Sequence, residues 1–98
     1  MKSISASEVQ QRLEAGESLN IIDVREVEEV AGGKIPGAVN IPLALLPIRM
    51  QELAKNKPYI IVCHAGGRSA QATMFLENQG FDATNMEGGM LAWAGEIE

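Results

Sequence analysis

The sequence predicts an α/β fold in which a mostly parallel sheet is covered by helices on both faces. Short apolar runs, typical of buried strands, alternate along the chain with segments whose apolar residues recur at helical spacing. The 98 residues can form one hydrophobic core, and a hydrophobic content of 46% with only 4% aromatic residues indicates that this core is mostly aliphatic. We therefore expect residues 1–98 to form a single domain.

The first half of the chain is predicted to begin with a helix. Ser5 is followed three residues later by Glu8, which is the pattern of a capping box, and Gly16 provides a stop. The apolar run at residues 19–24 predicts a strand, residues 26–31 a short helix, and residues 39–41 a second short strand.

The second half continues this alternation. Pro47 can serve as the first residue of a helix that reaches about residue 55. The β-branched run at residues 59–62 predicts a buried strand, residues 69–79 carry apolar side chains at helical spacing, and Gly80 follows as a stop. Residues 83–86 predict one more short strand before a terminal turn.

The single cysteine, Cys63, lies on the turn between the strand at 59–62 and the helix at 69–79. Backbone N–H groups converge at such a turn, and the helix dipole presents its positive end there. Gly66 and Gly67 can adopt the positive φ that a ring of inward-pointing N–H groups requires. A lone cysteine is often a small buried hydrophobe. This turn instead predicts a nucleophile. Lowering the pKa of the Cys63 thiol by about two units needs about 2.7 kcal/mol of preferential thiolate stabilisation, which the helix terminus and the N–H groups of the turn can supply.

The residues that follow Cys63 form the predicted cradle of the thiolate: His64, Ala65, Gly66, Gly67, Arg68 and Ser69. Arg68 contributes a permanent positive charge and a planar donor fork for an oxyanion. His64 is a candidate general base, although its position in the chain directs it away from the thiol. One cysteine and one histidine cannot supply a metal site, so we expect neither a metal nor a cofactor.

Charge and hydropathy exclude several classes of partner. The net charge is −5 and the eight Lys and Arg residues form no basic stripe, so we expect no nucleic-acid binding. The longest apolar region, residues 41–50, is interrupted by proline, so we expect no membrane partner. The acidic residues Glu26, Glu28 and Glu29 are interpreted as a solvated helix face. Without a secretory signal or a possible internal disulfide, the expected location is cytoplasmic.

Four blocks of the sequence, in order, resemble the motifs of single-domain rhodanese-like sulfurtransferases. Residues 22–26 resemble the pattern Asp-x-Arg-Glu, and residues 33–42 resemble Gly-His-Ile-Pro-Gly-Ala-x-Asn-Ile-Pro. Residues 63–69 resemble the active-site loop Cys-x-x-Gly-x-Arg-Ser, and residues 87–93 resemble Glu-Gly-Gly-x-x-x-Trp. The main departure is Lys34, which stands where the family usually has histidine.

The resemblance implies a central, mostly parallel five-stranded sheet and a thiosulfate or sulfane sulfurtransferase of the rhodanese type. Cys63 would take the outer sulfur of a small anionic donor, thiosulfate or a persulfide, and become a persulfide itself. The acceptor would be cyanide, a thiol or another protein. Asp23 and Arg25 would form an ion pair that supports the site, whereas Asn40 and Trp93 would be fold determinants.

Three other functions compete with this interpretation. A cysteine-dependent phosphatase or arsenate reductase also uses a cysteine and an arginine around an anion cradle. Its loop carries five residues between the two, whereas four separate Cys63 from Arg68 here. A non-catalytic binding or regulatory module on the same fold is a second alternative, although such modules often lose the cysteine. A third is a sulfur carrier that hands its sulfur to another protein.

Overall fold

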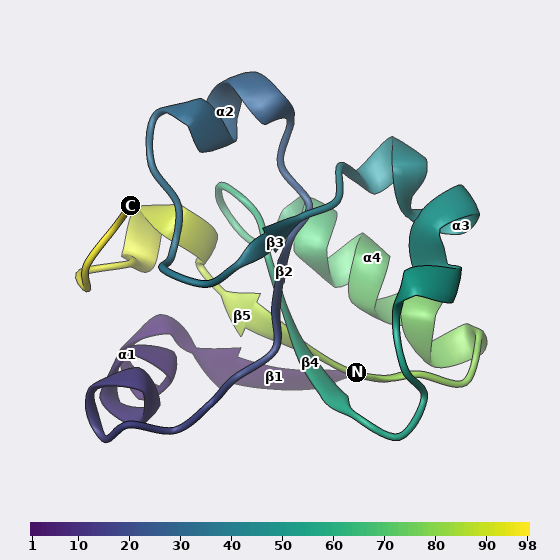
Figure 1. Cartoon of the computed structure of the whole chain (residues 1–98), viewed down its shortest axis with the longest axis horizontal. Helices are drawn as coiled ribbons and strands as arrows, with labels where there is room; N and C mark the ends of the chain where they lie inside the picture. The colour runs from purple at the N-terminus through teal and green to yellow at the C-terminus, as the bar shows by residue number, and fades with distance from the viewer.

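The computed structural model describes residues 1–98 and contains a five-stranded parallel sheet flanked by helices (Figure 1). In chain order the elements are β1 (Lys2–Ser5), α1 (Ala6–Glu14), β2 (Ile21–Asp23), α2 (Val27–Ala31), β3 (Val39–Asn40), the 3-10 helix η1 (Leu43–Leu45), α3 (Leu46–Arg49), the 3-10 helix η2 (Met50–Glu52), β4 (Pro58–Val62), α4 (Gly67–Asn78), β5 (Asp82–Glu87) and the 3-10 helix η3 (Gly89–Ala92). Every strand pairing is parallel, so the predicted α/β class is confirmed. None of these helices has the length and apolar character needed to cross a membrane.

The strand order β1-β5-β4-β2-β3 places β4 in the middle of the sheet. Because all strands run in the same direction, their carboxyl ends lie along one edge, which is where ligands bind in open parallel sheets. Cys63 is the residue directly after β4 and therefore lies at the centre of that edge.

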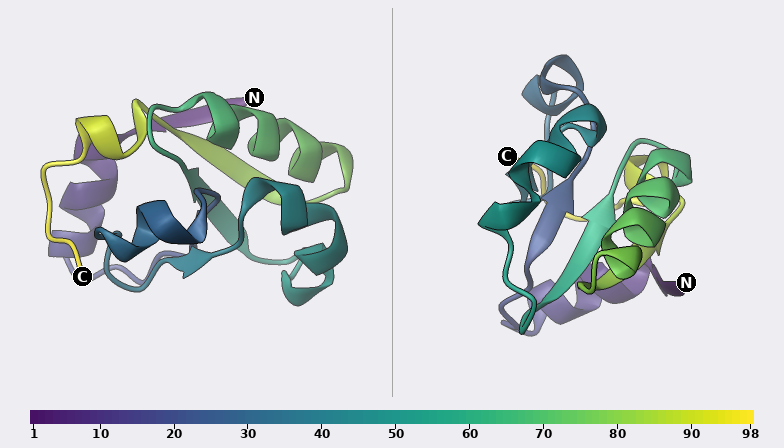
Figure 2. Two further views of the ribbon diagram at one scale, coloured as in Figure 1. Left: turned by 90° about the horizontal axis from the view of Figure 1, so that it is seen from above. Right: turned by 90° about the vertical axis from the view of Figure 1, so that its right-hand side faces the viewer.

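Two buried clusters cover the opposite faces of the sheet, because successive residues of a strand point to opposite sides. Ile61 of β4 packs into one cluster together with Leu46 of α3 and Leu76 of α4. Its neighbour Val62 packs into the other cluster with Val9 of α1. Figure 2 (left) shows α3 and α4 on one side of the sheet, and α1 with η3 on the other.

The strand β1 is the one strand that the residue pattern did not predict individually. Residues 2–5 read Lys-Ser-Ile-Ser and are mostly exposed, because β1 is an edge strand whose main chain pairs with β5. Pairing of the backbone, not burial of side chains, defines such a strand, so its hydropathy does not reveal it. The Oγ of Ser5 accepts a hydrogen bond from the N–H of Glu8 (3.1 Å), so α1 begins where the capping pattern predicted.

Two helices have bounds that differ from the prediction. The helix expected from Pro47 to about residue 55 begins at Leu46 as α3 and ends at Glu52, because its last turn tightens into the 3-10 geometry of η2. The helix expected at 69–79 begins earlier, at Gly67, with Gly66 as its N-cap in the left-handed region at φ 109°. The start of α4 therefore lies inside the loop that follows Cys63.

Candidate active site

The loop from Cys63 to Gly66 connects the central strand β4 to α4 (Figure 1). It lies between α2, which contributes Glu29 to a contact with Arg68, and η3, whose N–H groups bond to the loop carbonyls. Three segments far apart in the sequence therefore meet at this loop and the start of α4. The side chain of Cys63 itself is only 1% exposed.

The sulfur atom of Cys63 has two polar partners, one in its own loop and one on the first turn of α4. The N–H of Gly66 donates to Sγ at 3.0 Å, and the Oγ of Ser69 lies 3.2 Å from Sγ. Ser69 is fully buried, on the first turn of α4, and its Oγ also donates to the carbonyl of Gly66 at 3.2 Å. The polar groups of the helix start therefore point at the sulfur, as an anion cradle requires.

These contacts change the acidity of the thiol. Burial raises the pKa of Cys63, because the thiolate loses hydration. The hydroxyl of Ser69 and the main-chain N–H groups of Ser69, Gly66 and Ala65 lower it, and together they outweigh burial, so the net pKa lies below the ordinary value. A lowered pKa increases the thiolate fraction at neutral pH, and the thiolate is the nucleophilic form.

The carbonyl groups of the loop are bonded on the side away from the sulfur. The N–H of Met90 donates to the carbonyl of Cys63 (2.8 Å), and the N–H of Leu91 donates to the carbonyl of His64 (2.9 Å). Gly89 makes this approach possible, because a Cβ there would lie 2.5 Å from the carbonyl oxygen of Cys63. The first turn of η3 thus holds the carbonyls and leaves the N–H groups free to face Sγ.

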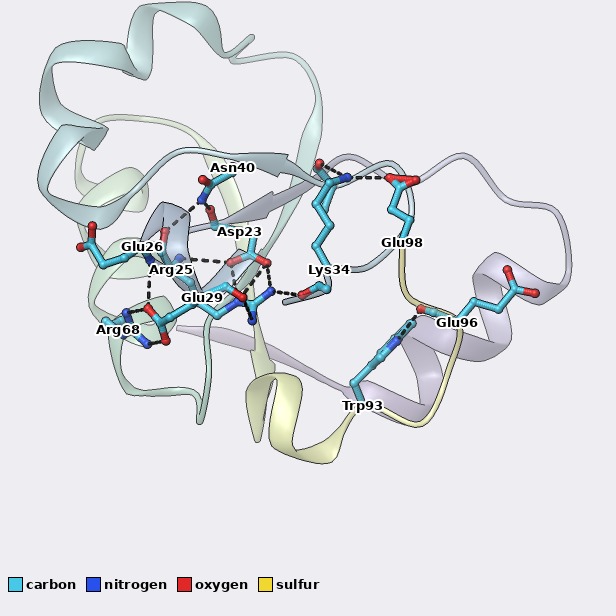
Figure 3. A network of polar contacts seen from close by, with 12 residues as sticks. Asp23, Arg25, Glu26, Glu29, Lys34, Asn40, Arg68, Trp93, Glu96 and Glu98 are labelled. Carbon is cyan, nitrogen blue, oxygen red and sulfur yellow. Dashed lines mark hydrogen bonds and ion pairs between the residues drawn. The ribbon is translucent and has the colours of Figure 1, made fainter. Parts of the chain in front are cut away.

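Arg68 is engaged by a carboxylate from α2. Its Nη1 and Nη2 donate to Oε1 and Oε2 of Glu29 at 2.7 and 2.8 Å, in a bidentate pair (Figure 3). The pair raises the pKa of Arg68 and lowers the pKa of Glu29 to about 2. The hydrogen bond from the N–H of Glu26 also lowers the pKa of Glu29. Glu26 and Glu28 are exposed, as predicted for a solvated face, but that interpretation is wrong for Glu29.

Asp23 and Arg25 are in contact and buried beneath α2. The guanidinium of Arg25 donates to both carboxylate oxygens of Asp23 at 2.8–3.2 Å, and it also donates to the carbonyls of Glu29 (3.4 Å) and Gly33 (2.8 Å). The side-chain amide of Asn40 donates to the carbonyls of Asp23 and Arg25, both at 2.9 Å (Figure 3). Together these bonds attach α2 to the ends of β2 and β3.

The other predicted site residues have simpler environments. The side chains of His64 and Ala65 are exposed, and Gly67 is the first residue of α4. Lys34 donates to Oε1 of Glu98 (2.6 Å) and to the carbonyl of Ala38 (3.0 Å), so it ties the turn before β3 to Glu98. This contact is what the lysine makes in place of the usual histidine.

Sequence reasoning missed two contributors to the site, Glu29 and Gly89. One sequence signal could have indicated that Glu29 has a structural role: it follows Glu26 by three residues at the start of a short helix, which is the spacing of a capping box. In the structure Oε1 of Glu29 accepts from the N–H of Glu26 at 2.9 Å. Its pairing with Arg68 spans 39 residues and has no local signal.

Comparison with known proteins agrees with this geometry. The family model described as "Rhodanese-like domain" matches residues 5–96. The chain is 47% identical over 98 residues to the Bacillus subtilis protein named "Putative sulfurtransferase YtwF", covering 100% of this chain and 95% of that protein. It is 39% identical over 95 residues to the Allochromatium vinosum protein named "Sulfurtransferase", covering 96% of this chain and 89% of that protein.

Among solved structures, a rhodanese-like domain protein from Staphylococcus aureus superposes with a TM-score of 0.94 at 44% identity, covering 100% of this chain and 97% of that one. The chain belongs to the rhodanese-like domain family, and the resemblance carried by the four sequence blocks is confirmed.

Proposed function

We propose that this protein is a sulfurtransferase in which Cys63 carries the transferred sulfur as a persulfide. The donor is thiosulfate or another sulfane compound, and the acceptor is cyanide, a thiol or a protein. The observation that carries the proposal is the pair of donors on Sγ of Cys63, the Gly66 N–H at 3.0 Å and the Ser69 hydroxyl at 3.2 Å. They stabilise the thiolate of Cys63 when it attacks the donor and again when it leaves from the persulfide.

In the first step the thiolate of Cys63 attacks the outer sulfur of the donor. A new S–S bond of about 2.05 Å forms, and the bond between the two sulfur atoms of the donor breaks. With thiosulfate the electron pair of that bond leaves on sulfite, and the negative charge of the thiolate passes to the outer sulfur of the Cys63 persulfide. No proton is consumed, so this step needs no general acid, and His64 is not required for it.

In the second step a nucleophilic acceptor attacks the outer sulfur of the persulfide. The S–S bond on Cys63 breaks and its electron pair returns to Sγ, which regenerates the thiolate. Cyanide becomes thiocyanate, and a thiol becomes a persulfide. The Gly66 N–H and the Ser69 hydroxyl stabilise the returning charge on Sγ, so the leaving group is the same cradled thiolate that began the cycle.

The recessed position of Cys63 supports sulfur transfer over phosphoryl transfer. The residue is 1% exposed, although His64 and Ala65 of the same loop are exposed. A terminal sulfur atom is a single atom wide, whereas a phosphoryl group brings oxygens that each need a donor. A loop with four residues between Cys63 and Arg68 forms a tighter ring than the five of phosphatase signatures.

Mass spectrometry of the intact protein tests the proposal. After incubation with thiosulfate or an alkyl hydropersulfide, we expect a mass gain of one sulfur atom, located on the peptide that contains Cys63, and its loss on adding cyanide. The Cys63→Ser variant should show no gain and should retain its circular dichroism spectrum. A gain that persists in the variant, or no gain from either donor, contradicts the proposal.

A further inference from the structure

Arg68 is the only cation of the cysteine loop, and its charge is already compensated. Both Nη atoms donate to the two carboxylate oxygens of Glu29, and the side chains are only 35% and 33% exposed. A pair in this geometry presents little net charge to an approaching anion. Arg68 directly precedes Ser69, whose Oγ lies 3.2 Å from Sγ of Cys63, so its charge belongs to the same turn as the reacting sulfur.

Glu29 is held in this position by contacts other than Arg68. Its Oε1 also accepts from the N–H of Glu26 at 2.9 Å, which completes the capping box of α2. The carbonyl of Glu29 and that of Gly33 accept from the buried guanidinium of Arg25. The carboxylate is therefore presented to Arg68 by a helix that is anchored to the sheet. It stays ionised throughout the physiological pH range, because its pKa is about 2.

The surroundings of the pair are acidic and apolar. Glu26, which is exposed, lines the same groove as Arg68, and the whole chain carries a net charge of −5. This groove has a volume of about 400 Å³. Most of its other lining side chains are apolar: Leu43, Ala44, Leu46, Pro47 and Phe75. The surface beside the loop therefore suits an organic group better than a small, highly charged anion.

We propose that Glu29 is a specificity-determining residue which, by neutralising Arg68, makes the Cys63 site discriminate against multiply charged donors such as thiosulfate. Donors whose outer sulfur is carried on an uncharged or singly charged organic group are preferred, and the apolar groove beside Arg68 accommodates that group. For sulfur donors this inference rests on the proposed function. The discrimination by charge applies equally to any reagent that attacks or binds at Cys63.

The variant Glu29→Gln tests the inference with little change in shape. Glutamine keeps Oε1, which can still accept from Glu26 and from Nη1 of Arg68, but it replaces Oε2 by an NH₂ group that faces Nη2. The charge of Arg68 is then uncompensated. The matched control is Glu28→Gln, which removes the same charge from an exposed neighbour on α2 that is not paired with Arg68.

Alkylation of Cys63 provides a readout that does not depend on sulfur transfer. Iodoacetate and iodoacetamide have nearly the same size and differ by one negative charge. In Glu29→Gln we expect the ratio of their rate constants, iodoacetate over iodoacetamide, to rise roughly three- to tenfold at low ionic strength, and the rise to vanish at high salt. A change in the pKa of Cys63 affects both reagents alike and cancels in the ratio. An unchanged ratio, or an equal rise in Glu28→Gln, overturns the inference.

Sulfur donors provide the second readout. Thiosulfate and methanethiosulfonate both present an outer sulfur on an oxidised sulfur, but the first is a dianion and the second a monoanion. The ratio of kcat/KM for thiosulfate over methanethiosulfonate should rise roughly three- to tenfold in Glu29→Gln and return to the wild-type value in Glu29→Gln/Arg68→Gln. An unchanged ratio with active enzyme contradicts the inference alone. If neither donor reacts while the alkylation ratio rises, the proposed function fails and the charge discrimination stands.

Discussion

At the scale of single residues, the proposed chemistry depends on which partner the hydroxyl hydrogen of Ser69 bonds to. Ser69 Oγ lies 3.2 Å from Sγ of Cys63 and 3.2 Å from the carbonyl oxygen of Gly66. With a thiol present, the S–H can donate to Oγ while Oγ donates to the carbonyl. With a thiolate, the hydroxyl can turn and donate to sulfur. The serine can therefore exchange its bond to the carbonyl for a bond to the thiolate, which stabilises the anion.

Replacing Ser69 by alanine is expected to raise the pKa of Cys63. The variant loses the hydroxyl that lowers this pKa, while the burial that raises it remains. The thiolate fraction at neutral pH falls, so persulfide formation from a saturating donor should slow by roughly an order of magnitude. The measurement is the rate of iodoacetamide alkylation against pH, and the midpoint should move to higher pH.

The matched control for this experiment is Ser18→Ala, a change at an exposed serine between α1 and β2. Its midpoint should coincide with that of the wild type, and the wild-type midpoint should lie below the value of about 8.5 for a free cysteine. If Ser69→Ala lowers only the plateau rate and leaves the midpoint in place, the serine positions the loop and does not stabilise the thiolate.

At the scale of elements, the loop geometry depends on η3 as much as on α4. The N–H groups of Met90 and Leu91 do not contact the sulfur; they donate to the carbonyls of Cys63 and His64. This contact requires a residue without a side chain at position 89, where φ is +56°. The element that follows β5 is therefore part of the candidate active site, although it begins 26 residues after the cysteine.

We expect Gly89→Ala to destabilise the protein and to reduce persulfide formation. A Cβ there would lie 2.5 Å from the carbonyl oxygen of Cys63 and 2.6 Å from that of His64, both backbone atoms that cannot move independently. The cost in free energy of unfolding should be about 2–4 kcal/mol, measured by urea denaturation. Gly67→Ala is the control, because a Cβ at that position meets nothing within 4 Å. Equal stability of the two variants would disprove the proposed close approach.

At the scale of the whole molecule, the pattern of apolar runs was enough to predict the fold class, and a local turn was enough to predict where Cys63 lies. The strands β2, β4 and β5 and the helix after the cysteine were predicted because each buries side chains at its own spacing. The strand β3 is exposed or half-buried, and the buried Ile41 that follows it made its prediction possible. The edge strand β1 was missed because it contributes backbone pairing more than burial. The Arg68–Glu29 pair was missed because it joins residues 39 positions apart, and such contacts depend on the fold itself.

The buried pair of Asp23 and Arg25 connects the sheet to α2, the helix that carries Glu29. Asp23 is fully buried and Arg25 is 5% exposed, so removing the carboxylate leaves an uncompensated guanidinium inside the protein. We expect Asp23→Asn to lower the free energy of unfolding by about 3–5 kcal/mol. It should also loosen α2, so the iodoacetate to iodoacetamide ratio at Cys63 should rise toward that of Glu29→Gln.

Urea denaturation measures the loss of stability, and Glu8→Gln provides the comparison. That change breaks the exposed pair between Glu8 and Arg12 on α1, which should contribute less than about 1 kcal/mol. If Asp23→Asn costs no more than Glu8→Gln, the buried pair is not what holds α2 on the sheet. If stability falls as expected but the alkylation ratio stays at the wild-type value, Glu29 is positioned by its own capping contacts with Glu26, and the sheet does not control the charge on Arg68.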